Sequence, residues 1–266
     1  MIRVVVSGAK GRMGTQVVEA VSKAEDLKLV GCYAPLNEGE HIVCADGDFV
    51  CSANLDALLD EVKPDVMVDF SLPKVARGNV ECALKHGVHV VLGTTGTSAE
   101  DLKDSWERCS CNGAHLFVAP NFTTGAVLMM QFAKLAAEFF DDIEIIELHH
   151  NGKADAPSGT AVQTARMMAQ ARKGKKNIGP GSETEMEGFK GARGTEVEGI
   201  RVHSVRGDGY MASQEIIMST PGQILTIRHD STQRTSYMPG VLLAIRSVMS
   251  LEEGFVIGLD KLMGLA

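Results

Sequence analysis

Strand-like and helix-like segments alternate along the first half of the chain. Ile2 to Val6 is β-branched apart from Arg3, which is typical of a buried strand. Val17, Val18 and Val21 then fall at helical spacing. The same pattern predicts strands over residues 27–32, 66–70, 88–92 and 114–119, and helices over residues 55–62, 75–85 and 99–108. Strands that alternate with helices indicate βαβ units and a parallel sheet.

The pattern changes after Asn121. Apolar runs predict a long helix over residues 126–140, a strand over 143–149 and a second helix over 160–172. Residues 173–194 are rich in glycine and charge, which predicts a mobile loop. Strands are predicted over residues 200–206, 214–220 and 224–230, and the Thr220–Gln223 turn favours an antiparallel hairpin for the last two. A final apolar helix is predicted over residues 241–249.

These elements predict an α/β protein with two domains. Residues 1–121 are expected to form a Rossmann-like, doubly wound parallel sheet that binds a dinucleotide. Residues 122–235 are expected to form a second, α+β domain with a mixed sheet. The last helix is expected to return to the first domain, so that residues 236–266 complete it.

Composition narrows the class of protein. Of the 266 residues, 44% are apolar and 23% are charged, as in ordinary globular proteins. The net charge of −8 counts against a nucleic-acid binder, and the apolar runs are too short to span a membrane. All six cysteines lie in the first half, which favours reduced thiols in the cytoplasm. Cys109, Cys111 and His115 are an alternative metal site, but they lack a second C-x-x-C pair, so no metal is expected.

A glycine loop joins the first predicted strand to the first predicted helix. It runs Gly8-Ala9-Lys10-Gly11-Arg12-Met13-Gly14. Glycines allow a tight turn and a close approach to a pyrophosphate, and the helix N-terminus favours negative charge. An ordinary tight turn is the alternative, but the position between strand and helix favours a dinucleotide site.

The end of the second predicted strand bears on the choice of dinucleotide. Ala34 and Pro35 stand where an acidic residue would grip a ribose 2′-hydroxyl. No carboxylate there repels a 2′-phosphate, and Lys10 and Arg12 are candidates to attract one, although both also fit a solvated loop surface. We therefore expect use of either NADH or NADPH.

Two further turns follow predicted parallel strands. They are Gly93-Thr94-Thr95-Gly96 and Ala119-Pro120-Asn121-Phe122. Ligands of open α/β sheets bind at the carboxyl ends of such strands. Each turn alone also fits a plain connection, but together with the glycine loop they are candidates to line one crevice.

The most unusual stretch is E-L-H-H-N-G-K-A-D-A-P-S-G-T-A, residues 147–161. His149 and His150 would point to opposite faces of an extended strand, which favours different roles for them. Lys153 lies in a loop just beyond, and Gly159 and Thr160 would offer amides at a helix start, where a carboxylate binds well. Acid–base chemistry with anion binding is favoured over a structural role or a metal site, since no third metal ligand stands nearby.

At these residues the sequence resembles the dihydrodipicolinate reductase family, whose members are also called 4-hydroxy-tetrahydrodipicolinate reductases. The resemblance covers nearly the whole chain. It includes V-S-G-A-K-G-R-M-G at the N-terminus, V-D-F-S-L-P at 68–73, G-T-T-G at 93–96, A-P-N-F at 119–122, the His-Lys block, and L-T-I-R-H-D-S at 225–231. The His-Lys block is the most specific of these motifs.

The resemblance implies an NAD(P)H-dependent oxidoreductase of lysine and diaminopimelate biosynthesis. Its substrate would be a cyclic imine with two carboxylates, and its second domain would bind substrate and hold a homotetramer together. His149 would be the acid/base and Lys153 the proton donor, while His150, Gly159 and Thr160 would bind substrate. The implied cofactor contacts are Gly8 to Met13, Gly93 to Thr95 and Ala119 to Phe122. Family members often have an acid at the position of Ala34-Pro35, so this departure affects the expected cofactor preference.

Two other classes of function remain open from the residues. A nucleotide-sensing binding module would need the glycine loop but not the His-Lys block. A dehydrogenase that acts on an aldehyde commonly needs a reactive cysteine after the nucleotide domain. No cysteine follows Cys111, which counts against that class.

Overall fold

The computed structural model describes residues 1–172 and 188–265. They divide into two compact units, one formed by residues 1–124 with 237–265 and the other by residues 125–172 with 188–236. Most of the mobile loop predicted over 173–194 lies outside the described residues. Within the described part of the chain, no helix is long and apolar enough to cross a membrane.

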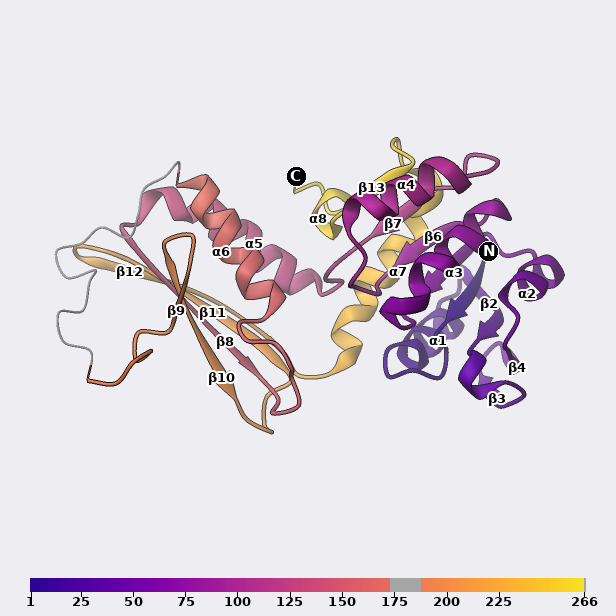
Figure 1. The fold of residues 1–266 in the computed structure, drawn as a ribbon, viewed down its shortest axis with the longest axis horizontal. Coiled ribbons are helices and arrows are strands. Elements are labelled where there is room, and N and C mark those ends of the chain that lie inside the picture. The colour runs from indigo at the N-terminus through magenta and orange to yellow at the C-terminus, as the bar shows by residue number, and fades with distance from the viewer. Residues whose placement is uncertain (173–187, 266) are drawn as a thin grey trace. The chain divides into compact units, whose positions relative to one another are not determined.

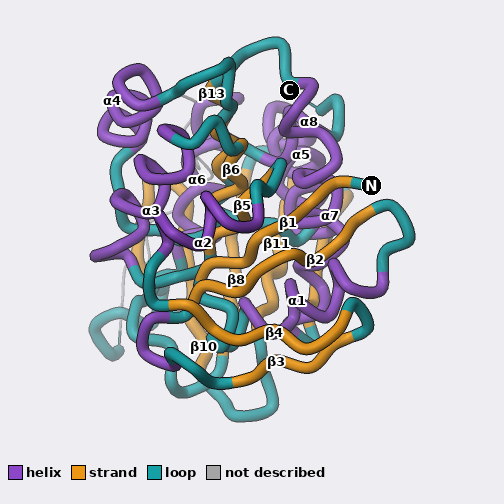
Figure 2. The backbone as a smooth tube through the Cα atoms, turned by 90° about the vertical axis from the view of Figure 1, so that its right-hand side faces the viewer, coloured by secondary structure: helices purple, strands orange, loops and turns teal. Residues whose placement is uncertain are grey.

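The first unit contains an eight-stranded sheet. Its strand order is β13-β7-β6-β5-β1-β2-β4-β3, and only the β3–β4 pair is antiparallel. Figure 2 shows β4, β2, β1, β5 and β6 side by side in this order. The strands are β1 (Ile2–Ser7), β2 (Leu27–Tyr33), β3 (His41–Cys44), β4 (Gly47–Ser52), β5 (Val66–Asp69), β6 (His89–Leu92), β7 (Leu116–Val118) and β13 (Phe255–Ile257). The predicted α/β class with a Rossmann-like sheet is confirmed.

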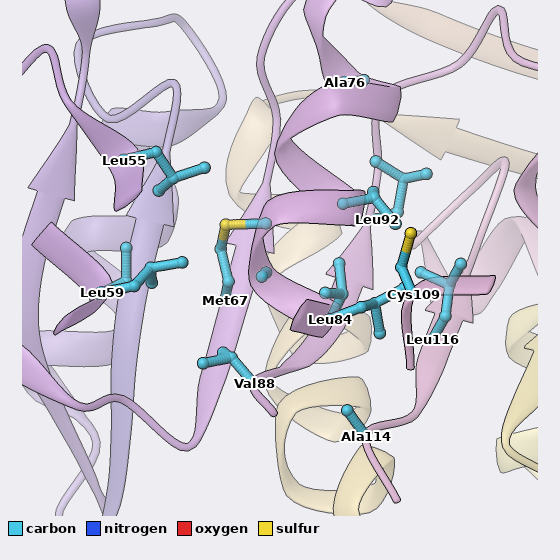
Figure 3. Close-up of a cluster of buried hydrophobic side chains, with 14 of the residues drawn as sticks. Leu55, Leu59, Met67, Ala76, Leu84, Val88, Leu92, Cys109, Ala114 and Leu116 are labelled. Carbon is cyan, nitrogen blue, oxygen red and sulfur yellow. The ribbon is translucent and has the colours of Figure 1, made fainter. Parts of the chain in front are cut away.

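Helices line both faces of this sheet. They are α1 (Gly14–Lys23), α2 (Leu55–Val62), α3 (Pro73–Lys85), α4 (Ala99–Cys109), α7 (Met238–Ser247) and α8 (Leu259–Leu262). The unit also has 3-10 turns at Pro35–Asn37 and Val248–Ser250, and a further 3-10 turn at Arg234–Tyr237 stands at the boundary of the two units. Helices α2, α3 and α4 share one apolar cluster with the sheet. In Figure 3, Met67 of β5 lies between Leu59 of α2 and Leu84 of α3. Val5 joins this cluster, so Val4 and Val6 point to the other face, where α1 packs against β1 and β2.

Three strands of this unit were not predicted. Strands β3 and β4 are mostly exposed, so they lack the buried alternating pattern that marks a strand. Strand β13 has only three residues but pairs with β7 in parallel. The C-terminal segment therefore completes the sheet with a strand as well as contributing α7 and α8.

The second unit contains a five-stranded mixed sheet in the order β12-β11-β8-β10-β9, which confirms the expected α+β pattern. Its strands are β8 (Asp142–His149), β9 (Thr195–Val197), β10 (Ile200–Arg206), β11 (Ala212–Thr220) and β12 (Gln223–Ser231). Strands β8 and β10 are parallel, and the other pairs are antiparallel. The predicted hairpin is confirmed, since Thr220 of β11 pairs with Gln223 of β12.

Two helices cover one face of this second sheet, as Figure 1 shows. They are α5 (Thr124–Ala136) and α6 (Gly159–Ala171). Alternate strand residues such as Ile143, Ile145 and Ile216 pack under them. The helix predicted over 126–140 was too long, because the last turn tightens into a 3-10 segment at Ala137–Phe139.

Candidate active site

The glycine loop turns tightly between β1 and α1. Gly8 has a φ of +77°, which favours glycine. A Cβ on Gly14 would lie 2.0 Å from the carbonyl oxygen of Gly8, so the start of α1 packs directly on the loop. The amide of Gly11 donates to the same carbonyl at 2.8 Å. A tight glycine turn at the start of a helix fits a pyrophosphate, because the first backbone N–H groups of a helix have no partner within the helix and favour negative charge.

The three predicted cofactor segments meet around Phe70, just after β5. A Cβ on Gly8 would lie 2.6 Å from the Phe70 carbonyl oxygen, and one on Gly93 would lie 2.1 Å from the Phe70 ring. The rings of Phe70 and Phe122 lie 5.6 Å apart between centroids. The structure therefore brings the glycine loop, the Gly93–Gly96 turn and the end of the 119–122 segment together.

A buried carboxylate that sequence reasoning missed ties these turns to the sheet. The side chain of Asp69, at the end of β5, is fully buried. It accepts hydrogen bonds from the hydroxyls of Ser7 (2.7 Å), Ser71 (2.8 Å) and Thr94 (2.7 Å). The Ser71 amide (3.0 Å) and the Asn79 side chain (2.9 Å) donate to it as well. Asp69 is part of the V-D-F-S-L-P motif. An acidic residue at the end of an apolar strand was the sequence feature from which its role could have been predicted.

A second missed carboxylate lies near the predicted ribose position. Lys10 of the glycine loop forms an ion pair with Glu40, with Nζ and Oε2 3.0 Å apart. The hydrogen bond from Asn37, together with Lys10, lowers the pKa of Glu40. The side chain of Ala34 is buried, which costs little because it has no polar group. A carboxylate therefore stands six residues after Ala34, on a turn that folds back to Lys10. Arg12 is exposed.

His149 lies at the end of β8 against a carboxylate and a guanidinium. Its Nδ1 hydrogen-bonds to Oε2 of Glu147, whose side chain is fully buried. Arg206 of β10 donates to both carboxylate oxygens, with Nη1–Oε2 at 3.0 Å and Nη2–Oε1 at 2.8 Å. Glu147 and His149 lie on the same face of β8 because they are two residues apart. Only His149 of this trio was predicted.

The contacts among Glu147, His149 and Arg206 shift the pKa values of Glu147 and His149. Burial alone would raise the pKa of Glu147, but hydrogen bonds from Arg206, Ser204 and His149 outweigh it and hold that pKa below its ordinary value. Burial lowers the pKa of His149, and the charges of Lys153 and Arg206 act in the same direction against the opposing Glu147. Near neutral pH the pair is therefore a carboxylate beside a neutral imidazole.

Lys153 and the start of α6 hold a carboxylate of the chain itself. Nζ of Lys153 donates to Oδ1 of Asp155 at 2.6 Å. This bond and the amide of Gly159 both lower the pKa of Asp155. Ser158 caps α6 by accepting from the Ala161 amide at 3.2 Å. Helix α6 begins at Gly159 with Thr160 next, so the predicted amide cradle stands beside the predicted ammonium group.

His150 follows β8 and is half-buried. Its carbonyl accepts from the Lys153 amide at 3.1 Å, which closes the turn that presents Lys153. Within residues 1–172 and 188–265, the one group of three His, Cys, Asp or Glu side chains close enough for a metal is Asp56, Cys82 and His86. Cys109, Cys111 and His115, the alternative metal site that the sequence disfavoured, are not such a group among the described residues. Nδ1 of His115 instead hydrogen-bonds to the Val248 carbonyl at 2.8 Å.

Comparison with known proteins places both units in one family. The family model described as dihydrodipicolinate reductase, N-terminus, matches residues 2–122. The model described as dihydrodipicolinate reductase, C-terminus, matches residues 125–263. The two matches include the glycine loop and the His-Lys block.

Individual relatives agree over full length. A 4-hydroxy-tetrahydrodipicolinate reductase of Listeria welshimeri is 48% identical over 266 residues, which covers 98% of this chain and 100% of the relative. One of Mycolicibacterium smegmatis is 44% identical and covers 100% of both chains. The solved structure of a dipicolinate-bound dihydrodipicolinate reductase from Paenisporosarcina sp. TG-14 matches with a TM-score of 0.85 at 40% identity, and the match covers 98% of this chain and 99% of that chain.

Proposed function

The chain belongs to the dihydrodipicolinate reductase family, and from this premise we propose that it reduces 4-hydroxy-tetrahydrodipicolinate to tetrahydrodipicolinate in lysine and diaminopimelate biosynthesis. The observation that supports the reaction best is the end of β8. There an imidazole backed by a buried carboxylate, an ammonium group and a helix N-terminus lie within one short stretch of chain.

The first unit would bind the reduced dinucleotide, which supplies a hydride when bound. The contacts would come from Gly8, Ala9, Lys10, Gly11, Arg12, Met13, Gly93, Thr94, Thr95, Ala119, Pro120, Asn121 and Phe122. The support is the crowding of these three segments around Phe70 and the absence of any room for a Cβ at Gly8 and Gly14. Either NADH or NADPH would serve, since Lys10 can meet a 2′-phosphate and Glu40 can meet a 2′-hydroxyl.

The second unit would bind the dicarboxylate and deliver a proton. Gly159, Thr160 and His150 would hold substrate carboxylates. Asp155 supports this, because its carboxylate already takes the Lys153 ammonium and the Gly159 amide. The product lacks the 4-hydroxyl group, so that group must leave as water to give a conjugated ring, to whose carbon 4 the hydride would add. Lys153 would donate the proton that the neighbouring ring carbon takes up, and His149 would act as acid/base. A well-placed donor of this kind contributes roughly 10²–10⁴ in rate.

The second unit would also hold a homotetramer together. Its sheet is covered by helices on one face only among the described residues. Ile146, Val205, Ile217 and Ile224 alternate to the other face, where each is partly or largely exposed. Such an apolar sheet face is typical of a buried interface. Sedimentation equilibrium would give four chain masses for a tetramer and one for a monomer. We also propose that the enzyme acts in the cytoplasm, because its six cysteines are free thiols.

The test is a coupled assay. The upstream synthase makes substrate in situ from pyruvate and aspartate semialdehyde, and oxidation of NADH or NADPH is followed by near-ultraviolet absorbance. Loss of absorbance that depends on the synthase is the expected result. If protein that binds dinucleotide shows no such loss with either cofactor, the reductase proposal is wrong and a nucleotide-binding module is favoured.

A further inference from the structure

The buried carboxylate of Glu147 has more partners than packing requires. It lies on the helix-covered face of β8, in line with Ile143 and Ile145 of the apolar cluster. A buried charge is costly unless it is paired and hydrogen-bonded. Glu147 meets that condition through the two-pronged contact with Arg206 at 3.0 and 2.8 Å and through the bond with His149. An isoleucine at this position would pack without any of these bonds, so the carboxylate indicates a role beyond stability.

The contact between Glu147 and His149 selects one form of the imidazole. A carboxylate only accepts hydrogen bonds, so the ring nitrogen that faces it must bear the proton. That nitrogen is Nδ1. Nε2 is then the nitrogen that exchanges a proton with whatever lies in front of the ring. A carboxylate behind an imidazole also limits rotation of the ring, because the bond is lost when the ring turns.

Arg206 connects the same carboxylate to the loop that bears Lys153. Besides Glu147, Nη2 of Arg206 donates to the backbone carbonyl of Asp155 at 2.8 Å. The side chain of Asp155 in turn accepts from Lys153 at 2.6 Å. Strands β8 and β10 are paired, with His149 opposite Arg206, so the guanidinium is mounted on a rigid element. One hydrogen-bonded path thus joins the imidazole to the ammonium group.

We propose that Glu147 and Arg206 are the positioning residues of this active site. Glu147 fixes the tautomer and the orientation of His149, and Arg206 sets the place of the Lys153 loop relative to that ring. Neither residue needs to touch substrate. The inference rests on the proposed function for its consequence in turnover, but the tautomer and the ring orientation are properties of the free protein.

The main test is Glu147→Gln, studied together with the wild type. Glutamine keeps the shape but replaces one oxygen with an NH₂ group, so it cannot accept both at the position of Oε1, which takes Nη2 of Arg206, and at that of Oε2, which takes His149 and Nη1 of Arg206. When its oxygen faces Nη2 of Arg206, its NH₂ group faces Nδ1 of His149 and favours the tautomer with the proton on Nε2. Two-dimensional ¹H–¹⁵N spectra of the histidine rings are expected to show the Nδ1–H form of His149 in the wild type and a mixture of tautomers in the variant. We expect kcat/KM for the imine to fall about 10- to 1,000-fold, with dinucleotide affinity unchanged.

The pH profile gives a readout that a merely structural role would not move. The charged groups that act on His149 are Glu147, Lys153 and Arg206. Of these, Glu147 alone raises the pKa of His149, so its neutralisation lowers that pKa further. The limb of kcat/KM that reports His149 should therefore shift to lower pH in Glu147→Gln.

A matched pair in the first unit provides the control. Asp26 and Arg246 form the same two-pronged contact at 2.7 and 2.8 Å, at the surface and without a histidine. Asp26→Asn should leave the ring spectra, the pH profile and kcat/KM unchanged. Arg206→Lys is the second variant, because it keeps a positive charge beside Glu147 but cannot span Glu147 and Asp155 as a fork does. We expect Arg206→Lys to retain the Nδ1–H form and to lose turnover.

The outcomes separate the two proposals. If the wild type shows a single Nδ1–H tautomer and a folded Glu147→Gln protein loses it, the positioning role is supported. This holds even if neither protein reduces the imine, in which case only the proposed function is wrong. A folded Glu147→Gln protein with the wild-type tautomer and wild-type kcat/KM overturns the inference. If Glu147→Gln does not fold, Arg206→Lys decides, and unchanged kcat/KM in that variant overturns it.

Discussion

Asp69→Asn tests how the cofactor turns are held to the sheet. The buried carboxylate accepts from five donors, three at Oδ1 and two at Oδ2. Asparagine keeps the shape but replaces one oxygen with an NH₂ group. If its oxygen stays on the Ser71 and Thr94 side, the new NH₂ group faces the hydroxyl of Ser7 and the side-chain NH₂ of Asn79.

The magnitude follows from those two contacts. The Ser7 hydroxyl can turn to accept, but the NH₂ group of Asn79 cannot. It loses its bond to the carboxylate (2.9 Å) and keeps only the longer bonds to the hydroxyls of Ser7 (3.2 Å) and Ser71 (3.3 Å), at a cost of about 1–3 kcal/mol. The three bonds on the other side become neutral, and a charge-assisted bond is roughly twice as strong as a neutral one. The removal of a buried charge offsets part of this loss. We expect the free energy of unfolding to fall by about 2–4 kcal/mol.

The assay is urea unfolding followed by a probe of the first unit, together with dinucleotide titration. Asp46→Asn is the control, because among the described residues Asp46 accepts one side-chain hydrogen bond, from the backbone amide of Leu29 at 2.8 Å. The amide oxygen of asparagine can still accept there, so the change should stay below about 1 kcal/mol. We expect Asp69→Asn also to weaken dinucleotide binding, since Thr94 loses its anchor. Equal stability and equal affinity in both variants would refute the reasoning.

Four further predictions follow from the site. Lys153→Ala should lower kcat about 10²–10⁴-fold with dinucleotide affinity intact, and near-normal kcat in the coupled assay would exclude it as the proton donor. Glu40→Gln should free Lys10 and raise the NADPH-to-NADH ratio of kcat/KM about two- to fivefold, whereas an unchanged ratio would show that the ion pair has no part in selection. Gly14→Ala should cost at least about 1–3 kcal/mol and weaken dinucleotide binding, because its Cβ would lie 2.0 Å from a loop carbonyl; wild-type melting and affinity would contradict this. The pKa of Glu147 is lower in the folded protein than its ordinary value of 4.5, so ionised Glu147 stabilises the fold fully above pH 4.5 and loses this contribution as pH falls through the folded-state pKa. The melting temperature should therefore fall more steeply below about pH 4.5 in the wild type than in Glu147→Gln, and parallel curves would contradict this.

Most of the fold could be predicted because its buried elements have strong patterns. The strand at Ile2–Ser7 is almost continuously apolar, and the helices after it place apolar residues on one face. The start of α6 could be predicted from Pro157 to Thr160, because a serine before a glycine and threonine is a good helix cap. Strands β3 and β13 could not, since one is exposed and the other has three residues that gain their partner only in the folded sheet.

The residues proposed to carry the chemistry could be predicted from the sequence, but the residues that hold them in place could not. His149, Lys153 and the helix start lie within one stretch, so residue types and spacing were sufficient to nominate them. Arg206 lies far along the chain and reaches Glu147 only through the register of β10 against β8. Glu40 reaches Lys10 only because the chain folds back after β2. Such partners depend on tertiary structure, which local pattern does not contain.

The most direct test of the central claim is the fate of the hydride. The enzyme would be run in the coupled system with NADH or NADPH deuterated at the transferred position of the nicotinamide, and the product analysed by mass spectrometry and NMR. The account predicts one deuterium in tetrahydrodipicolinate, at ring carbon 4, and a solvent-derived hydrogen at the neighbouring carbon. A product without the cofactor's deuterium, or formed at the same rate without the protein, would contradict it.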